Sequence, residues 1–234
     1  HAITDLRYVP DAAFPLFLTA REWLLLVDGT LTKPFFTAAE RTASAHSNTW
    51  HEERRMLFEI PDLEVDGGDD DAEEAGADGA QGAAGAQAGG GARPRREVNY
   101  SYFADVMWPR LNSAGQYPYH PSLVFTEIFS FIKGSAESME LPQGRLRLAD
   151  YTQMGKKRSP NFAGNRDLIY EIYLKYEKLK TELHCFDIMD AVFYIYRQLK
   201  ESETGYVGVP VHAMYHDEVQ DFTQAELMLG FLVS

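Results

Sequence analysis

The chain has 234 residues, a net charge of −13 and a mean hydropathy of −0.33, which are typical of a water-soluble globular protein. No run of 18 apolar residues occurs, so we expect no transmembrane helix, and the single cysteine, Cys185, excludes an internal disulfide. Ten acidic and three basic residues lie in the 62–97 segment, a balance of −7 that leaves −6 for the remainder. Composition therefore gives no independent support for nucleic-acid binding.

Residues 1–61 predict helical structure. Thr19 and Glu22 have the spacing of a capping box, in which each side chain satisfies a backbone N–H at the start of a helix. The apolar block Trp23–Val27 that follows predicts a short buried helix. The stretch Ala38–Ile60 is polar and rich in Arg, Glu and Ala, which predicts a second helix with a solvated face.

Residues 62–97 have a different composition. Gly, Ala, Asp, Gln and Glu dominate this segment, and it contains no aromatic residue. Such a segment cannot bury enough apolar area to offset the conformational entropy lost on ordering. We predict a disordered acidic insertion that serves as a linker.

Residues 98–204 predict a helical unit. Apolar residues at helical spacing follow Val98, and Pro109 is expected to end that helix. A second apolar helix is predicted over Pro121–Ile132; if Glu127 inside it is buried, it needs a partner such as Lys133 or an arginine.

Two amphipathic helices follow in the same unit. Asn165–Leu183 carries a stripe of Leu, Ile and Tyr side chains at helical spacing, with lysines and Glu on the other side. Asp187–Lys200 has a similar stripe, and Asp187 suits the N-cap position. We interpret both stripes as faces of the hydrophobic core.

Lys156, Lys157 and Arg158 form the densest cationic cluster outside the 62–97 segment. We expect these residues in a loop. A cationic loop near aromatic side chains can hold a nucleic-acid backbone. An ordinary solvated loop has the same composition, so both interpretations stay open here.

Residues 205–234 contain the most specific pattern. Val209–Tyr215 alternates as a strand does, and Thr223 begins a capping box that predicts a helix. Between them lies DEVQD, Asp217–Asp221 (hereafter the acidic segment). A strand that ends in paired carboxylates before a helix is typical of nucleotide-hydrolysing α/β domains, where Asp217 would hold Mg²⁺ and Glu218 would orient the attacking water. The alternative is a solvated acidic turn, since acids favour helix N-termini.

Two histidines near the acidic segment raise the possibility of an unrelated metal-dependent hydrolase. His212 and His216 are four residues apart and close to Asp217. On a strand, however, this spacing separates them by about 13 Å. The pattern therefore favours the nucleotide-hydrolysing interpretation over a histidine metal site.

The order D-E-x-Q-D in the acidic segment resembles motif II, the Walker B element, of UvrD/Rep-like superfamily 1 helicases. His216 departs from this pattern, because the family usually has an apolar residue there. Further segments resemble one branch of that group, the large TPR and ankyrin repeat-containing proteins. They are Phe14–Leu18, Trp23–Asp28, Glu127–Ser135 (EIFSFIKGS), Arg166–Lys180 (RDLIYEIYLKYEKLK) and Phe186–Ala191 (FDIMDA).

The resemblance implies a mainly α fold with a small α/β part. Residues 98–204 would be a helical 1B-like subdomain inserted in a partial RecA-like, P-loop NTPase core, whose strand and following helix are residues 205–234. It also implies an ATP-dependent helicase or translocase acting on single-stranded DNA or RNA. Asp217 would bind Mg²⁺, Glu218 would act as general base and Gln220 would sense the γ-phosphate. Lys156, Lys157 and Arg158 would contact the nucleic-acid backbone.

The Walker A loop, G-x-x-x-x-G-K-[ST], occurs nowhere in the chain, which begins with His rather than Met. We therefore expect a piece of a longer intracellular protein, nuclear or cytoplasmic, with no membrane contact. The Walker A loop and the rest of the helicase core would lie outside it, so ATP and Mg²⁺ would bind only in the longer protein and this piece alone would be inactive. The alternative is a helicase-derived scaffold or interaction module without activity; an intact or degraded upstream Walker A loop would discriminate the two.

Overall fold

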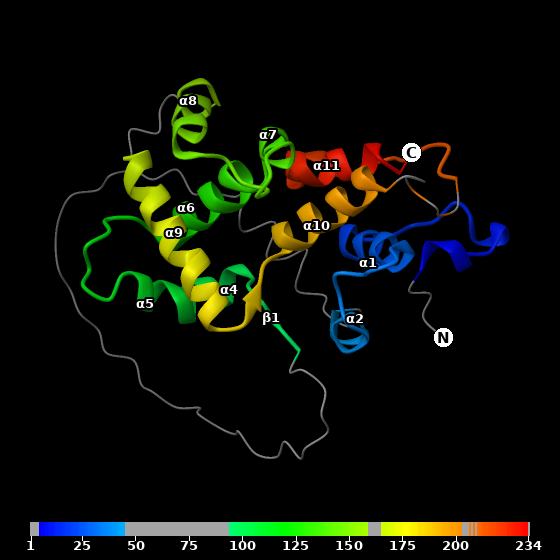
Figure 1. The fold of residues 1–234 in the computed structure, drawn as a ribbon, viewed down its shortest axis with the longest axis horizontal. Helices are drawn as coiled ribbons and strands as arrows, with labels where there is room; N and C mark the ends of the chain where they lie inside the picture. Colours follow the sequence, from blue (N-terminus) through cyan, green and yellow to red (C-terminus); the bar gives the residue numbers. More distant parts are fainter. Residues whose placement is uncertain are drawn as a thin grey trace, which may run out of the picture.

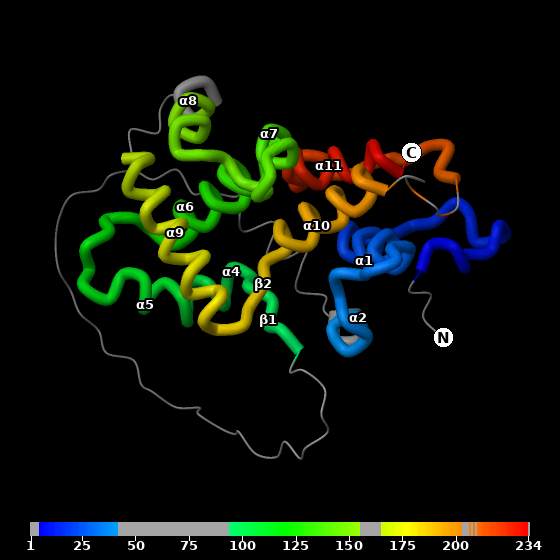
Figure 2. The backbone as a smooth tube through the Cα atoms, in the orientation of Figure 1, coloured from blue at the N-terminus to red at the C-terminus, as the bar shows by residue number. Residues whose placement is uncertain are grey.

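The computed structural model of the chain describes residues 5–44, 94–158, 165–202, 206, 208 and 210–233. Helices dominate these residues, and the sheet within them consists of two short parallel strands (Figures 1 and 2). The predicted mainly α class is confirmed, whereas the described residues contain no RecA-like sheet. Among the helices of this part, none is long and apolar enough to cross a membrane.

The N-terminal part contains the predicted buried helix, α1 (Ala20–Thr30). Its capping box is formed: Glu22 N donates to Thr19 Oγ1 at 3.1 Å, and Thr19 N donates to a Glu22 carboxylate oxygen at 2.8 Å. Two 3₁₀ turns precede α1, and α2 follows it. They are η1 (Leu6–Tyr8), η2 (Asp11–Ala13) and α2 (Ala38–Ser44). Residues 45–60 of the second predicted helix lie outside the described residues.

Most of the predicted insertion also lies outside the described residues, but its last four residues do not. β1 (Arg96–Glu97) pairs in parallel with β2 (Cys185–Phe186). Contacts of Arg95, the residue before β1, hold the start of this strand against α2. Its backbone N–H donates to Glu40 Oε1 at 2.9 Å, and its guanidinium lies 4.2 Å from the ring centroid of Phe35. The contact ties α2 to the strand that begins the helical unit.

The first helix of that unit continues past Pro109, so the predicted end was wrong. It consists of α4 (Tyr100–Tyr102), the π-helical η3 (Phe103–Met107) and α5 (Trp108–Leu111). In the π-helical part, Trp108 N donates to the Phe103 carbonyl five residues back. This wider turn leaves room for the Pro109 ring, which would otherwise clash with a carbonyl of the preceding turn.

The other predicted helices of the unit are present. The second is α6 (Pro121–Thr126) with its π-helical continuation η4 (Glu127–Ile132), and it is followed by α7 (Ala136–Met139), α8 (Leu148–Arg158), α9 (Arg166–Glu182) and α10 (Ile188–Glu201). Asn165 caps α9 and Asp187 caps α10, the latter with Asp190 in a capping box. The prediction of a loop at Lys156–Arg158 was wrong, because these residues form the last turn of α8.

The core joins all these helices. Phe103 contacts Phe125 and Tyr176 with ring centroids 5.1 and 5.7 Å apart, which ties η3 to α6 and α9. α10 packs against both α1 and α11 (Gln224–Phe231) and lies between them (Figure 1). The helical unit and the C-terminal helix therefore share one hydrophobic core.

The C-terminal part differs from its prediction at one point. Residues 210–216 form neither a helix nor a strand, and no backbone hydrogen bond joins them to another residue that the structure describes, so the predicted strand Val209–Tyr215 is not formed there. A strand requires partner N–H and C=O groups, which the described chain does not offer at this place. The predicted capping box is present at the start of α11. Glu226 N donates to Thr223 Oγ1 at 3.3 Å, and Thr223 N donates to a Glu226 carboxylate oxygen at 2.9 Å.

Candidate functional site

The acidic segment lies between residues 210–216, which have no regular secondary structure, and α11. Asp217, Glu218 and Gln220 are exposed. Glu218 N donates to Asp217 Oδ1 at 3.0 Å, the Gln220 amide donates to the Glu218 carboxylate, and Asp221 N donates to the Glu218 carbonyl at 2.9 Å. No lysine or arginine in the described part of the chain forms an ion pair with Asp217 or Glu218. Both carboxylates are therefore open to an external cation.

Glu218 has a left-handed backbone conformation, with φ 48° and ψ 47°. This conformation costs a non-glycine residue about 1–2 kcal/mol. Such outliers concentrate at functional sites, where surrounding structure maintains the strain. The strain at Glu218 is therefore consistent with a functional role for the acidic segment.

We expect Glu218→Gly to raise the free energy of unfolding by about 0.5–1 kcal/mol, because glycine adopts positive φ without a steric penalty. Urea unfolding of the chain would measure the change. Glu218→Gln is the matched control: it also removes the charge but keeps the Cβ, and it should give no comparable gain. Equal stability of the two variants would show that the left-handed conformation imposes no cost.

His216 does not disturb the packing beside the acidic segment. Its ring lies edge-on to Phe222, with centroids 5.1 Å apart. It also faces Gly230 of α11, where an added Cβ would lie 3.6 Å from His216 Nε2. His212 and His216 belong to no group of metal-ligating side chains among the described residues. The unrelated metal-dependent hydrolase therefore gains no support.

The structure does not bring the cationic cluster to the acidic segment. Lys156, Lys157 and Arg158 lie at the C-terminal end of α8. In Figure 1, α8 lies at the opposite end of the molecule from the residues that lead into α11. If both segments contribute to one function, they do so as separate sites.

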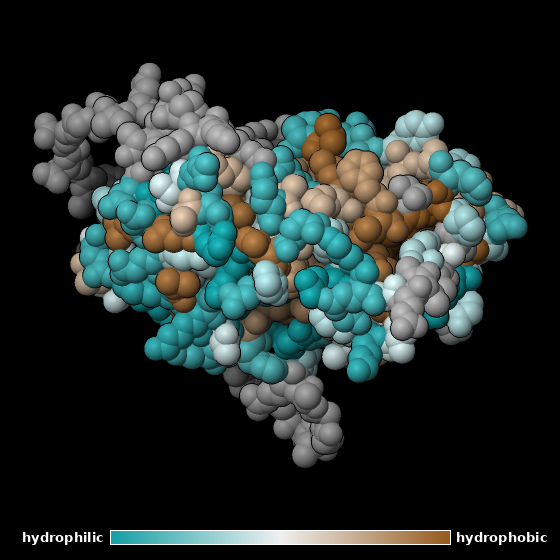
Figure 3. Space-filling model, turned by 45° about the horizontal axis from the view of Figure 1, so that its top comes forward, coloured by the Kyte–Doolittle hydropathy of each residue, from teal (hydrophilic) through white to brown (hydrophobic). Residues whose placement is uncertain are grey.

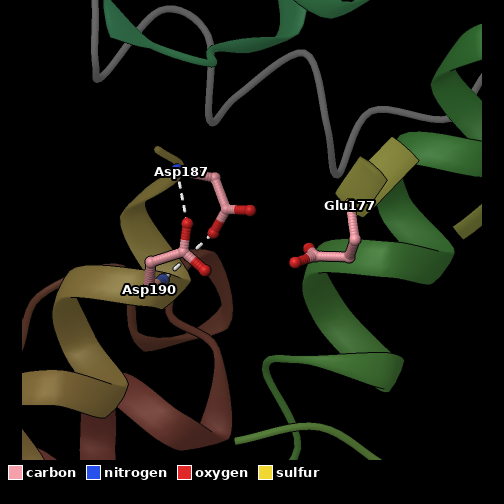
Figure 4. A group of neighbouring side chains, drawn as sticks. All are labelled: Glu177, Asp187 and Asp190. Carbon is pink, nitrogen blue, oxygen red and sulfur yellow. Dashed lines mark hydrogen bonds between the residues drawn. The ribbon is translucent and has the colours of Figure 1, made fainter. Parts of the chain in front are cut away.

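Sequence reasoning missed a group of five charged side chains, three of them buried and two half-buried, hereafter the charge cluster: Lys133, Lys180 and Asp187 are buried, and Glu177 and Asp190 are half-buried. The Lys133 ammonium lies 2.5 Å from Asp187, 2.6 Å from Asp190 and 3.2 Å from Glu177. Lys180 binds the same three carboxylates at 2.7–2.9 Å. Figure 4 shows the carboxylates, from α9 and the start of α10, facing one another.

The charges of the cluster stabilise each other. Burial alone would raise the pKa of Asp187, but the ammonium groups of Lys133 and Lys180 hold it far below its usual range. Burial alone would lower the pKa of Lys133, but the carboxylates of Asp187, Asp190 and Glu177 raise it well above its usual value. The buried Asp187 and Lys133 therefore stay ionised at neutral pH because each lies against opposite charges.

Three carboxylates within 4.8 Å of one another are a possible cation site. Here the two ammonium groups already donate to every one of them. A divalent ion would have to displace a buried lysine, whose charge would then lack a partner. The arrangement is that of an internal ion network and not of a metal centre.

No pattern in the sequence indicates that these residues meet, although several of them lie in segments already noted. Lys133, Glu177 and Asp187 belong to the three segments EIFSFIKGS, RDLIYEIYLKYEKLK and FDIMDA that carry the family resemblance. Lys133 was considered as a partner of Glu127, which was wrong. Glu127 is buried and accepts a 2.6 Å hydrogen bond from the Tyr151 hydroxyl, and burial raises its pKa.

Comparisons with known proteins give a similarity over almost the whole chain. No family model matches the chain, and no solved structure matches it. Over 230 residues, 98% of this chain, the sequence is 36% identical to human TPR and ankyrin repeat-containing protein 1. The chain spans 8% of that protein's length. It is therefore similar, from end to end, to one short region of a much longer repeat-containing protein.

Proposed function

We propose that this chain is part of an ATP-dependent nucleic-acid helicase or translocase, to which it contributes the acidic segment. The observation that carries the proposal is the exposure of the Asp217 and Glu218 carboxylates without an internal cation among the described residues, directly before a capped helix. The charge cluster neutralises its carboxylates internally, whereas the acidic segment leaves its own carboxylates available.

The residues have distinct roles in this proposal. Asp217 holds Mg²⁺ and its bound water, Glu218 takes the proton of the attacking water, and Gln220 lies near the γ-phosphate. The phosphate-binding loop comes from residues outside this chain, because the sequence contains no G-x-x-x-x-G-K-[ST]. Residues 210–216 pair with strands of the same RecA-like core, which would satisfy their backbone groups.

Single-stranded DNA or RNA is the proposed partner. Lys156, Lys157 and Arg158 end α8 and supply the cationic turn for phosphate contact, and residues 98–204 serve as the 1B-like subdomain. These substrates place the longer protein inside the cell, in the nucleus or cytoplasm.

ATP hydrolysis by a longer form of the protein, extended in both directions, tests the proposal. We expect turnover that single-stranded nucleic acid stimulates, and we expect Glu218→Gln to lower it at least about 100-fold, because a general base contributes about 10²–10⁴-fold. Glu182→Gln, an exposed site on α9, is the control and should leave turnover unchanged. A folded longer protein that hydrolyses no ATP would exclude the helicase assignment.

A scaffold without activity is the second candidate, and the exposed apolar residues favour it. Phe17, Tyr215 and Phe231 are 91%, 94% and 77% exposed, and all belong to the N-terminal or C-terminal segment of the described chain. Figure 3 shows apolar side chains at the surface toward this end. Where exposed apolar groups form one continuous patch, they mark contact surfaces. A longer protein that folds and binds partners, but neither binds nor hydrolyses ATP, would support this candidate.

A further inference from the structure

The first turn of α11 rests on two residues adjacent to the charge cluster. Ala225 N donates to the Gly134 carbonyl at 2.9 Å, and the Thr223 hydroxyl lies 3.7 Å from the Met189 sulfur. Gly134 directly follows Lys133. Met189 lies inside the turn whose two aspartates bind Lys133. The ion pairs therefore hold together the two surfaces on which α11 begins.

The contact at Gly134 depends on the absence of a side chain. A Cβ there would lie 2.0 Å from the Phe129 carbonyl oxygen and 3.0 Å from the Thr223 side chain. Nearby, Ala136 N donates to the side-chain oxygen of Gln224 at 3.2 Å. The turn after Lys133 thus forms a close-fitting seat for the start of α11.

The seat also determines where the acidic segment lies. Thr223 caps α11 and is two residues after Asp221. Within the segment itself, the backbone contacts are short-range, such as Asp221 N to the Glu218 carbonyl. The segment therefore takes its position from α11: through Thr223 on one side and, on the other, through His216, which packs on Phe222 and faces Gly230.

We propose that Lys133 is a positioning residue for Asp217 and Glu218: its ammonium locks the turn at Gly134 to the start of α10, and together these hold the acidic segment through Thr223. Because Glu177 belongs to α9, the same contact connects α9 to the segment. The use of the segment in nucleotide hydrolysis rests on the proposed function, whereas its positioning does not.

Hydrogen exchange of backbone amides, measured by NMR on the chain, tests the positioning. The Ala225 amide reports the seat, and the Ile172 amide inside α9 reports general opening. We expect Lys133→Met to accelerate exchange at Ala225 at least about tenfold more than at Ile172, because the seat is released before the core opens. Glu177→Gln is a milder change, because it removes the charge of one half-buried carboxylate. It should also accelerate exchange at the Ala225 amide more than at Ile172, by a smaller factor.

Asp28→Asn is the matched control. Asp28 is fully buried and binds Phe35, Phe36 and Arg41, none of which belongs to the seat. This variant should accelerate both reporter amides by the same factor. Equal acceleration of the two amides in both Lys133→Met and Glu177→Gln would overturn the proposal.

Turnover of the longer protein provides a second and separable result. There, Lys133→Met should lower kcat for ATP at least about tenfold and change KM less, because displaced catalytic groups affect the chemical step more than binding. If the unaltered longer protein has no ATPase activity, the proposed function fails and the exchange result still decides the positioning. If ATPase activity is present but unaffected by Lys133→Met, the positioning role is refuted.

Discussion

Replacing Asp187 with asparagine is expected to lower the free energy of unfolding by about 3–5 kcal/mol, a large part of the roughly 5–15 kcal/mol that typical proteins possess. One Asp187 carboxylate oxygen accepts hydrogen bonds from Lys133, Lys180 and Tyr176. Asparagine keeps the size and the capping ability of the side chain, so the change isolates the negative charge. Both ammonium groups would stay buried, and Glu177 and Asp190, which are only half-buried, would be their remaining carboxylate partners in the cluster. Urea unfolding at pH 7 would measure the loss.

A control and a double variant make this expectation specific. Asp150→Asn breaks an exposed ion pair with Arg147, 2.6 Å long, and should leave the unfolding midpoint nearly unchanged. Combining Asp187→Asn with Lys133→Met removes one charge of each sign and should cost less than the sum of the single changes. Additive losses would show that the two side chains do not interact, and a loss as small as that of the control would show that the network adds no stability.

The second large effect is expected at Glu40, which joins α2 to the residue before β1. Glu40 is 5% exposed and its carboxylate binds Arg95 Nε at 3.1 Å. Burial alone would raise the pKa of Glu40, but the hydrogen bonds and charge of Arg95 lower it from 4.5 to about 2. A shift of this size corresponds to about 3 kcal/mol of stability when the carboxylate is ionised. We expect Glu40→Gln to lose about that amount at pH 7.

The stabilisation by Glu40 should depend on pH, and it should be lost toward acid. A carboxylate whose folded pKa is lowered stabilises the protein above its unfolded pKa, and the contribution is lost as the pH falls toward the folded pKa. The stability difference between wild type and Glu40→Gln should therefore be full above pH 4.5 and disappear as the pH falls to about 2. Glu40 also forms a capping box with Thr37 at the start of α2, because Thr37 N donates to its side chain and its own N–H donates to Thr37 Oγ1. Glutamine can accept the same hydrogen bond, so the helix start is retained. A difference that is constant with pH would refute the assignment of the effect to charge.

Local features of the chain were predictable from the sequence. The capping boxes at Thr19 and Thr223 and the cap at Asp187 are present as predicted. Each depends on side chains and backbone groups no more than three residues apart, so no distant partner is required. The amphipathic stripes of α9 and α10 face the core for a similar reason, because helical periodicity alone determines which residues share a face.

Features that require a distant partner were not predictable in the same way. The stretch ending at Tyr215 has the side-chain pattern of a strand, yet a strand also needs neighbouring backbone groups. Glu127 was expected to pair with Lys133 or an arginine. The fold gives it the Tyr151 hydroxyl and brings the charge of Arg166 near it, whereas Lys133 binds the carboxylates of α9 and α10. Pro109 continues a helix because a π-helical turn precedes it.

The sequence by itself determined the mainly helical class, the positions of the helix starts and the identity of the acidic segment, because these follow from short-range spacing and composition. Only the tertiary structure decided that Lys133, Glu177 and Asp187 form one buried network and that this network lies against the start of α11. Such a network depends on the separation of atoms that are 44 and 54 residues apart in the chain. No periodicity encodes that separation; it arises when the packed core brings the helices together.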